Sequence, residues 1–305
     1  MKPVVALVTA HAARGLDEDQ LPLEQALRAA GAQVEIAAWD EPEVDWTSFD
    51  IALLRSTWDY TDRLNEFLSW VHRTSGLTTL FNPPAVVRWN TDKHYLKELA
   101  SAGVPIVPST FVEPGMSVAA VLDEFVRRLQ TAELVVKPAV GAGSRDTQRY
   151  TRADRETAAA HAQRLLDARR SVVLQPYLDR VDEYGETALM FFAGQFSHAV
   201  RKGPMLAQAS AAQESTARGS TPLFLAEQIT SRTAAADELS VAARALAAIP
   251  FATPLYARVD LIREAAGEPV LLELELTEPS LFLGYAAGAA AKFAQVVLNR
   301  LEFKT

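Results

Sequence analysis

The sequence contains no cysteine, and this absence excludes disulfides, thiolate nucleophiles and zinc–thiolate sites together. Its five histidines are scattered without an H-x-x-x-H spacing, which argues against a histidine-based zinc site. Runs of basic residues are also missing, and the formal net charge is -8, so we expect no nucleic-acid-binding surface. These absences favour chemistry on a small molecule.

The chain also lacks a long apolar run. No segment approaches the roughly 20 apolar residues that span a membrane, so no membrane association is expected. The short apolar run at residues 4–9 leads into alternating strand and helix patterns, which favours a first buried strand over a signal peptide. We therefore expect a cytoplasmic protein. With 305 residues, 49% of them hydrophobic, the chain can form two or three modest cores.

Strand and helix patterns alternate through the first part of the chain. Short apolar segments typical of strands occur at residues 4–9, 33–38, 50–55 and 78–81. Helical patterns separate them at residues 23–30 and 62–74. This alternation predicts a parallel α/β unit, which ends at the Asn-Pro-Pro sequence of residues 82–84. A helix is then expected to begin near residues 90–92 and to carry Lys93 in its first turn.

The remainder of the chain predicts a mixed α+β arrangement within an α/β protein. Helical patterns cover residues 117–130, 153–169, 234–248 and 288–301. Strands are expected at residues 134–138 and 172–175, and hairpins at residues 186–202 and 255–276. Residues 203–221 have no clear period and indicate a loop or a mobile lid.

The second hairpin carries charged side chains on one face. Side chains two apart on a strand share a face, so Arg258 lies beside Asp260, and Glu273 beside Glu275. A hairpin that turns at residues 266–267 places Asp260 opposite Glu273 and Arg258 opposite Glu275. Three converging carboxylates repel unless a cation holds them, and oxygen ligands favour Mg²⁺ or Mn²⁺. The alternative is a solvated face of an edge hairpin.

A glycine-containing loop follows the strand that ends at Lys137. Gly141, Gly143 and Ser144 are small enough to let backbone N–H groups approach an anion, and the lysine supplies positive charge. These features indicate a phosphate cradle. The loop matches neither a P-loop nor a dinucleotide fingerprint, so a simple glycine turn is the alternative.

The strand at residues 172–175 runs into a possible nucleotide hinge. A proline lies among Gln175, Tyr177 and Leu178, and the backbone groups there are suited to hydrogen bonding with the edge of an adenine base. Asp182 and Glu183 follow closely and are suited to ribose hydroxyls. Each of these patterns has low specificity when it is taken alone.

In combination, these segments resemble the ATP-grasp ligases. They follow one another as Lys93, Lys137 with its glycine loop, residues 175–178, residues 258–260 and residues 273–275. The resemblance implies a three-lobed ATP-grasp fold with an N-terminal α/β substrate-side domain, a central lobe and a C-terminal lobe. These are placed at residues 1–88, 89–174 and 175–305.

The resemblance also implies roles for individual residues. Lys93 and Lys137 bind ATP phosphates, Lys202 is a further phosphate contact, and Arg258 steadies an acyl phosphate. The hinge residues bind adenine, and Mg²⁺ is held by Asp260, Glu273 and Glu275. Many members carry a Glu-x-Asn metal pair, whereas this chain has Glu-x-Glu, so which carboxylate bridges two metals stays open.

Residues 54–60 and 278–283 are similar to the subgroup that contains the cyclo-ligase of D-cycloserine biosynthesis. That resemblance implies ring closure of O-ureido-D-serine, an amino-acid-like small molecule, with ADP and phosphate as products. Arg55 lies just past an apolar strand, where its fork is suited to a substrate carboxylate. The other expected substrate contacts are Ser56, Asp59, Tyr60 and Ser280. The alternative is that Tyr60 caps a core and Arg55 pairs with a surface acid.

Two other functions stay open at this point. One is an intermolecular ligase that joins a carboxylate to an amine of a second molecule, as in peptide synthesis. The other is a nucleotide-binding module without chemistry, although an arginine beside the carboxylates is not needed for binding alone. The aromatic and apolar N-terminal unit is also compatible with a homo-oligomer.

Overall fold

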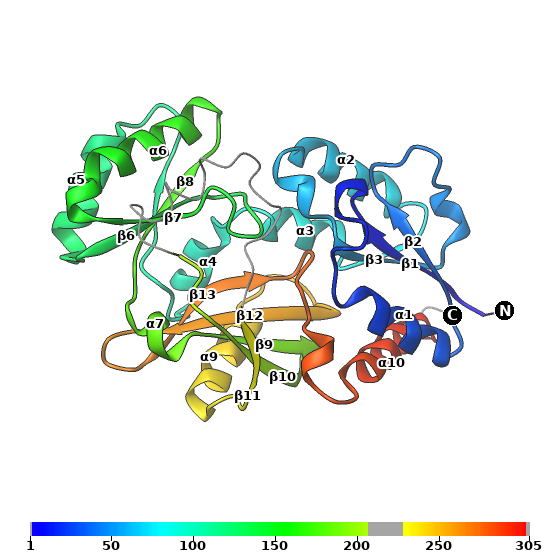
Figure 1. Ribbon diagram of the computed structural model, residues 1–305. Helices are drawn as coiled ribbons and strands as arrows, with labels where there is room; N and C mark the ends of the chain where they lie inside the picture. The colour runs from blue at the N-terminus through cyan, green and yellow to red at the C-terminus, as the bar shows by residue number, and fades with distance from the viewer. Residues whose placement is uncertain (1, 207–227, 303–305) are drawn as a thin grey trace.

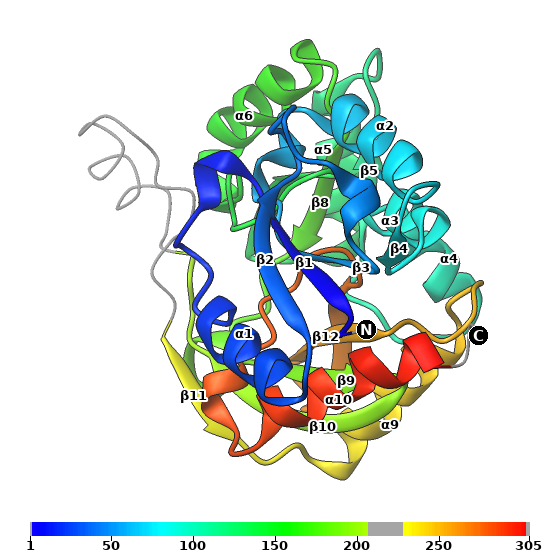
Figure 2. The same cartoon turned by 90° about the vertical axis from the view of Figure 1, so that its right-hand side faces the viewer.

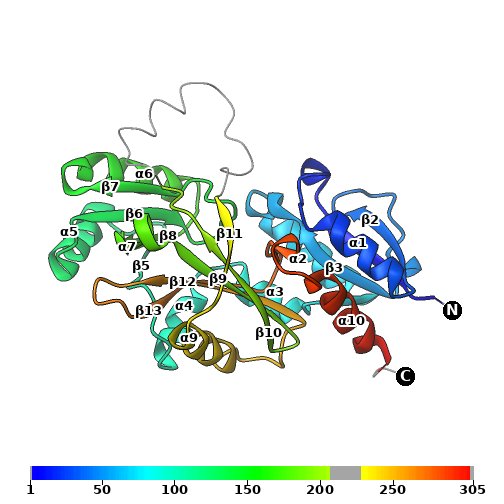
Figure 3. The ribbon, with the colours of Figure 1, turned by 60° about the horizontal axis from the view of Figure 1, so that its bottom comes forward.

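Three β-sheets form the framework of the protein, as the computed structural model shows for residues 2–206 and 228–302 (Figure 1). The first sheet has the strand order β2-β1-β3-β4, the second β5-β8-β6-β7 and the third β11-β10-β9-β12-β13. The second and third sheets lie one over the other, whereas the first stands beside them (Figure 3). In these two ranges no helix combines the length and apolarity needed to cross a membrane.

The first sheet is the predicted parallel α/β unit. Its strands are β1 (Val4–Thr9), β2 (Gln33–Ala38), β3 (Ile51–Ser56) and β4 (Thr79–Phe81), and all pairings are parallel. Every residue of β3 is buried, as expected for a central parallel strand that is covered on both faces. Helices α1 (Gln20–Ala29) and α2 (Leu64–Thr74) pack against it (Figure 2).

The second sheet is antiparallel and has helices on one face only. Its strands are β5 (Thr110–Val112), β6 (Glu133–Pro138), β7 (Gln148–Thr151) and β8 (Val172–Pro176). Helices α5 (Val118–Leu129) and α6 (Arg155–Asp167) bury Leu134 and Val136 of β6. Because side chains alternate along a strand, Val135 and Lys137 face the opposite side, where a cavity lies.

The third sheet is also antiparallel and carries the predicted charged hairpin. Its strands are β9 (Glu186–Phe192), β10 (Gln195–Lys202), β11 (Ile229–Arg232), β12 (Tyr256–Arg263) and β13 (Pro269–Glu275). Asp260 pairs with Glu273 and Arg258 with Glu275, which confirms the predicted register. Helices α4 (Tyr95–Ser101) and α9 (Ala236–Ala247) pack on the apolar face. The charged face is therefore left to the cavity.

Two sequence-based expectations about elements need correction or stay untested. The helix expected to begin near residues 90–92 begins instead at Tyr95, as α4, and a separate helix, α3 (Pro84–Asn90), precedes it, so that Lys93 lies in the turn between them. Tertiary contacts decide this break, because the Lys93 N–H donates to the Ala139 carbonyl at 2.9 Å. Most of the expected loop or lid, residues 207–221, lies outside the described residues.

The sequence reading missed several short elements. Strands β5, β7 and β11 and helix α7 (Arg180–Tyr184) are three to five residues long, too short for a clear period. The last helix, α10 (Ala289–Glu302), was expected, and it packs against α1 of the first unit. The C-terminal helix therefore packs on the N-terminal unit and shares one hydrophobic core with the first and third sheets.

Two buried asparagines attach the first unit to the charged hairpin. Asn82 donates to the carbonyls of Tyr256 and Leu276 at 3.0 and 2.8 Å, and it accepts the Leu255 N–H at 2.7 Å. At the end of β13, the Asn90 side-chain amide donates to the Leu274 carbonyl and accepts the Leu276 N–H, each at 2.7 Å. These side chains supply the backbone partners that the end of a strand otherwise lacks.

The Asn82 contacts lead to a stability prediction. Replacing Asn82 by alanine leaves three backbone groups without partners, and Asn82 is fully buried, so water cannot replace the lost bonds. We expect Asn82→Ala to lower the free energy of unfolding by about 2–4 kcal/mol, measured by urea denaturation. Asn65→Ala, on the exposed face of α2, is the matched control. An equal loss in both variants would contradict this role of Asn82.

Candidate active site

One cavity of about 590 Å³ lies where the three sheets meet. Its lining comes from the inner face of the second sheet, the charged face of the third sheet and loops of the first unit. Fifteen of the expected site residues line it. They are Tyr60, Lys93, Lys137, Gly141, Gly143, Ser144, Gln175, Tyr177, Leu178, Lys202, Arg258, Asp260, Glu273, Glu275 and Ser280. The sequence therefore located most of a single cavity from distant segments.

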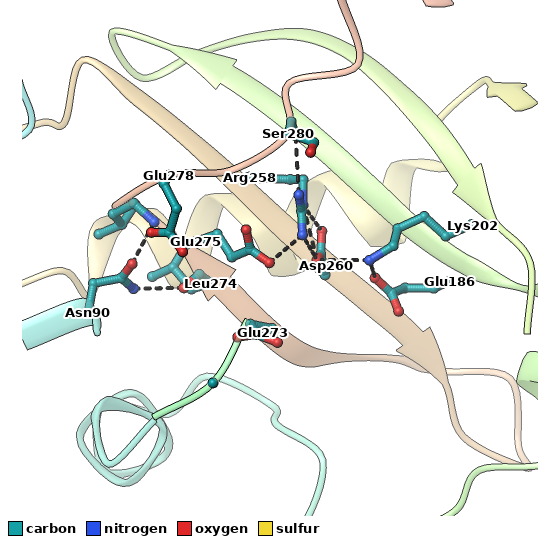
Figure 4. A network of polar contacts seen from close by, with 12 residues as sticks. Asn90, Glu186, Lys202, Arg258, Asp260, Glu273, Leu274, Glu275, Glu278 and Ser280 are labelled. Atoms are coloured by element: carbon teal, nitrogen blue, oxygen red, sulfur yellow. Dashed lines mark hydrogen bonds and ion pairs between the residues drawn. The ribbon is translucent and has the colours of Figure 1, made fainter. Parts of the chain in front are cut away.

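Arg258 is the centre of a hydrogen-bonded network on the charged face (Figure 4). Its Nε donates to both Asp260 carboxylate oxygens at 2.8 and 3.1 Å, and Nη2 donates to Asp260 Oδ2 at 2.8 Å. Nη2 also bonds Glu275, and Nη1 donates to the Ser280 carbonyl at 3.2 Å. These contacts fix the plane of the guanidinium, with Arg258 only 6% exposed.

A second buried ion pair lies next to this network. Lys202 Nζ lies 2.7 Å from Glu186 Oε1 and 3.6 Å from Asp260 Oδ2, so it links β9, β10 and β12 (Figure 4). Burial raises the pKa of Glu186 to about 7, although Lys202 acts in the opposite direction. Glu186 was not anticipated, because a single acidic residue at the start of a strand carries no sequence signal.

Lys93 joins the hairpin to the glycine loop. Its Nζ lies 2.7 Å from Glu273 Oε1 and donates to the Gly141 carbonyl at 3.0 Å. Burial lowers the pKa of Lys93, but Glu273, Glu275 and Glu278 together outweigh burial and the net shift is upward. The pKa of Glu273 moves downward, since Lys93 and Lys137 outweigh the effect of its own burial. The ion pair therefore stays charged at neutral pH.

Lys137 is a buried lysine whose pKa is lowered. Burial, together with the neighbouring Lys93 and Lys202, lowers its pKa from 10.5 to about 8, against the attraction of Glu273 and Glu186. Within the described ranges no carboxylate lies at ion-pair distance from it. A buried ammonium in this position attracts an anionic ligand, since such a ligand supplies the missing counter-charge.

The glycine loop has the backbone conformation that its sequence suggested. Gly143 and Ser144 both have positive φ values, 59° and 58°, and Gly141 is so close to Pro138 that an added Cβ would lie 3.0 Å from its Cγ. Arg145 then reaches across to Asp62 of the first unit at 2.7 Å. The loop thus borders the cavity beside Lys137 and is anchored at its far end.

The hinge segment lies on the cavity, but the acidic residues after it do not. Gln175 Nε2 donates to Ser109 Oγ at 2.9 Å, and the Tyr177 N–H donates to the Glu133 carbonyl at 3.0 Å. Asp182 turns away to bond the Tyr177 hydroxyl, and Glu183 lies beside it in α7. Neither Asp182 nor Glu183 lines the cavity. The short helix α7, which the sequence did not reveal, carries both away.

Three of the expected substrate contacts also lie outside the cavity lining. Arg55 is buried against two acids of the first unit, Asp17 at 3.6 Å and Asp19 at 3.3 Å. Ser56 donates to the Thr9 hydroxyl at 2.8 Å, and Asp59 accepts the Trp39 indole N–H at 2.8 Å. The acids that pair with Arg55 are buried rather than on the surface, and they come from the loop before α1.

Glu278 is a site residue to which sequence reasoning assigned no role. It is buried at the end of the cavity that borders the first unit, where it hydrogen bonds with Tyr60. Burial and the nearby Glu275 raise its pKa to about 8. The motif at residues 278–283 was noticed, but only contact with Tyr60, 218 positions away, reveals this environment.

The three hairpin carboxylates do not form a closed cage. In residues 2–206 and 228–302, no group of three or more potential ligands lies in a metal-binding arrangement, because Arg258 and Lys93 bond to these carboxylates. The donor chemistry still fits Mg²⁺, which prefers oxygen and binds through one or two carboxylates plus substrate phosphates. Burial raises the pKa of Glu275 to about 7. A cation bound there would act in the opposite direction, because it stabilises the ionised carboxylate.

The sheets and this cavity define an ATP-grasp protein, since solved ATP-grasp ligases share the fold over nearly the whole chain. One of them, PsnB bound to a minimal precursor, Mg and ADP, has a TM-score of 0.63 and 17% identity over 98% of each chain. The protein belongs to the family of the D-cycloserine synthetase DcsG. It is 41% identical over 305 residues to the cycloserine biosynthesis protein DcsG of Streptomyces lavendulae, which covers 98% of this chain and 99% of that one.

Two further comparisons agree with this family. The crystal structure of D-cycloserine synthetase DcsG matches with a TM-score of 0.88 and 40% identity, over 98% of this chain and 99% of that one. The family model for the N-terminal domain of D-cycloserine synthetase DcsG matches residues 5–82. The resemblance drawn from the sequence motifs is therefore confirmed.

Lys137 leads to a prediction about pH and stability. A lysine whose pKa is lowered to about 8 on folding costs stability at pH 7, and this cost disappears as the pH rises from 8 to 10.5. We expect ligand-free Lys137→Met to exceed the wild type in free energy of unfolding by up to about 3 kcal/mol at pH 7, with the gain shrinking toward pH 10. Urea denaturation across this pH range measures it.

The exposed Lys97 on α4 provides the control for this experiment. Lys97→Met removes the same charge without removing a buried ammonium, so its stability should follow the wild type at every pH. A Lys137→Met variant that is less stable than the wild type at both pH 7 and pH 10 contradicts the proposed burial cost.

Proposed function

We propose that this protein is an ATP-dependent ligase of cycloserine biosynthesis that activates a carboxylate as an acyl phosphate and captures it with a nitrogen of the same molecule. The substrates proposed are O-ureido-D-serine, ATP and water, and the products are D-cycloserine, ADP, phosphate, CO₂ and ammonia. The observation that carries this proposal is the meeting of three lysines, Arg258 and the hairpin carboxylates in one cavity. Membership of the DcsG family supports the substrate.

The cavity offers a consistent place for the nucleotide. Lys93, Lys137 and Lys202 converge from three separate segments, as the neutralisation of a triphosphate requires. The adenine would lie on the hinge, with Leu178 as the backbone donor because the Tyr177 N–H already bonds Glu133. Gly141, Gly143 and Ser144 would cover the phosphates.

Asp260, Glu273 and Glu275 would hold Mg²⁺, with Mn²⁺ as an alternative. The bound metal supplies charge neutralisation to the transferring phosphoryl group. The PsnB structure with Mg and ADP supports this pairing of metal and nucleotide in the fold. For the metal to bind, Arg258 and Lys93 must yield part of their contacts with Glu275 and Glu273.

The chemistry has two bond-forming steps. A substrate carboxylate oxygen attacks the γ-phosphorus, the bond to ADP breaks, and the resulting acyl phosphate carries a good leaving group. The nitrogen then attacks the acyl carbon, and phosphate leaves. Arg258 would stabilise the negative charge that develops on the acyl oxygen. Capture by the same molecule gains from proximity, since no second substrate has to be ordered.

The substrate would occupy the end of the cavity that borders the first unit. Glu278, Tyr60 and Ser280 line the cavity together there, since Glu278 hydrogen bonds with Tyr60. The ureido nitrogen that closes the ring carries a carbamoyl group, so mass balance requires water to remove this group as CO₂ and NH₃. The reaction is thus recognised by both a ring product and free ammonia.

A substrate assay tests this function. We expect ATP and O-ureido-D-serine together, without a second amine, to yield ADP, ammonia and a cyclic product by mass spectrometry. An intermolecular ligase would instead release ADP only when a separate acid and amine are both present. A nucleotide-binding module would bind ATP and release no phosphate with any substrate. Either of these results would contradict the assignment as a cyclo-ligase.

The metal assignment has its own prediction. We expect the double change Glu273→Gln and Glu275→Gln to lower Mg²⁺-dependent ADP formation by about 100-fold or more, because amide oxygens lack the charge that binds the metal. The control is Glu264→Gln with Glu268→Gln, which removes two charges from the turn of the same hairpin. Circular dichroism checks that both variants fold. Unchanged turnover in the first variant would falsify the assignment.

A further inference from the structure

Asp19 lies at a contact between the first unit and the segment after β13. Its carboxylate accepts hydrogen bonds from three successive backbone N–H groups, those of Leu281, Phe282 and Leu283, at 2.5, 3.0 and 2.6 Å. Asp19 is only 3% exposed. Three amide donors on one buried carboxylate form a strong, directional contact, because charge-assisted hydrogen bonds exceed neutral ones in strength.

Arg55 supplies a positive counter-charge beside this carboxylate. Its Nη2 lies 3.3 Å from Asp19 Oδ2, and its side chain is 2% exposed. A buried carboxylate without a counter-charge would be strongly destabilised, whereas an arginine beside it remains protonated at any ordinary pH. This observation gives Arg55, which does not reach the cavity, a defined role.

The same segment is held from its other side by the third sheet. His198 Nε2 lies 2.9 Å from the Leu281 carbonyl and 3.2 Å from the Phe282 carbonyl. Phe282 has a φ of +49°, a conformation that costs energy for a residue with a side chain and persists only where neighbours hold it. Asp19 and His198 therefore hold a strained backbone on both sides.

The held segment, residues 280–283, touches Arg258. The Ser280 carbonyl accepts from Arg258 Nη1 at 3.2 Å, and the Phe282 ring centroid lies 5.6 Å from the Arg258 guanidinium carbon. Arg258 also bonds Asp260 and Glu275, two of the carboxylates proposed to hold the metal. Its contacts with residues 280–283 involve none of these proposed metal ligands.

We propose that Asp19, paired with Arg55, is a positioning residue that sets the orientation of Arg258 through residues 280–283. The proposal rests on the function above, in which Arg258 acts on the transferred group. Small displacements of such a group are costly, since a shift of about 1 Å lowers rates by about 100-fold. The first unit thereby contributes to catalysis without touching the reacting atoms.

A double-mutant cycle tests this link. We expect Asp19→Asn, which keeps the shape but loses the charge, to lower kcat about tenfold or more with the KM for ATP unchanged. In an Arg258→Lys background, the same change should lower kcat less than about threefold, because the residue that it positions is already altered. Equal losses in both backgrounds would overturn the proposal.

A second measurement needs no turnover. Arg258 Nε–H is followed by ¹⁵N NMR and assigned by its loss in Arg258→Lys. We expect Asp19→Asn to shift or broaden this resonance, and the control Asp45→Asn, which removes an exposed carboxylate that bonds the Thr47 N–H, to leave it in place. An unchanged resonance in Asp19→Asn refutes the positioning role.

The two measurements separate this inference from the proposed function. If the wild type makes no ring product, the proposed function fails, while the resonance still reports whether Asp19 sets Arg258. If Asp19→Asn does not fold, Arg55→Gln takes its place, because it removes the counter-charge of Asp19 and keeps a polar side chain. A shifted resonance in Arg55→Gln supports the proposal, and an unchanged one overturns it.

Discussion

The bidentate ion pair between Arg258 and Asp260 is the interaction on which the cavity depends. Both side chains are nearly inaccessible, and neither charge could be buried without the other. Arg258 extends the network to Glu275 and Ser280, and Asp260 extends it to Lys202. Strands β10, β12 and β13 and the segment after β13 are thereby tied into one polar surface.

This polar surface lowers the stability of the ligand-free protein. Lys137 is kept buried with a lowered pKa, whereas Glu186 and Glu275 are kept buried with raised ones. Such shifts mean that the folded chain disfavours the charged forms that a nucleotide and a metal favour. Ligand binding would relieve these costs, which is the usual trade between stability and function at active sites.

The first unit and the helix that follows it, α3, hold the charged hairpin from outside. Asn82 and Asn90 bond the ends of β12 and β13, and Asp19 bonds the segment that follows. These three polar side chains come from loops and a helix end, and each hydrogen bonds with two or three backbone groups at once. The orientation of the carboxylates and of Arg258 thus depends on residues more than 160 positions away in the chain.

The hairpin register, the parallel unit and the shared face of Arg258 and Asp260 followed from local pattern, because strand alternation is a property of the sequence itself. The place of Lys93 in the cavity followed from the resemblance to the ATP-grasp ligases. The partners of Arg55, the break before Lys93 and the burial of Glu278 did not. Each of these depends on contacts between segments far apart in the chain, and a local pattern carries no information about which distant group will be the partner. The sequence by itself determined that the hairpin charges share one face, because side chains alternate along a strand, and only the tertiary structure decided which distant groups join them and how they pair.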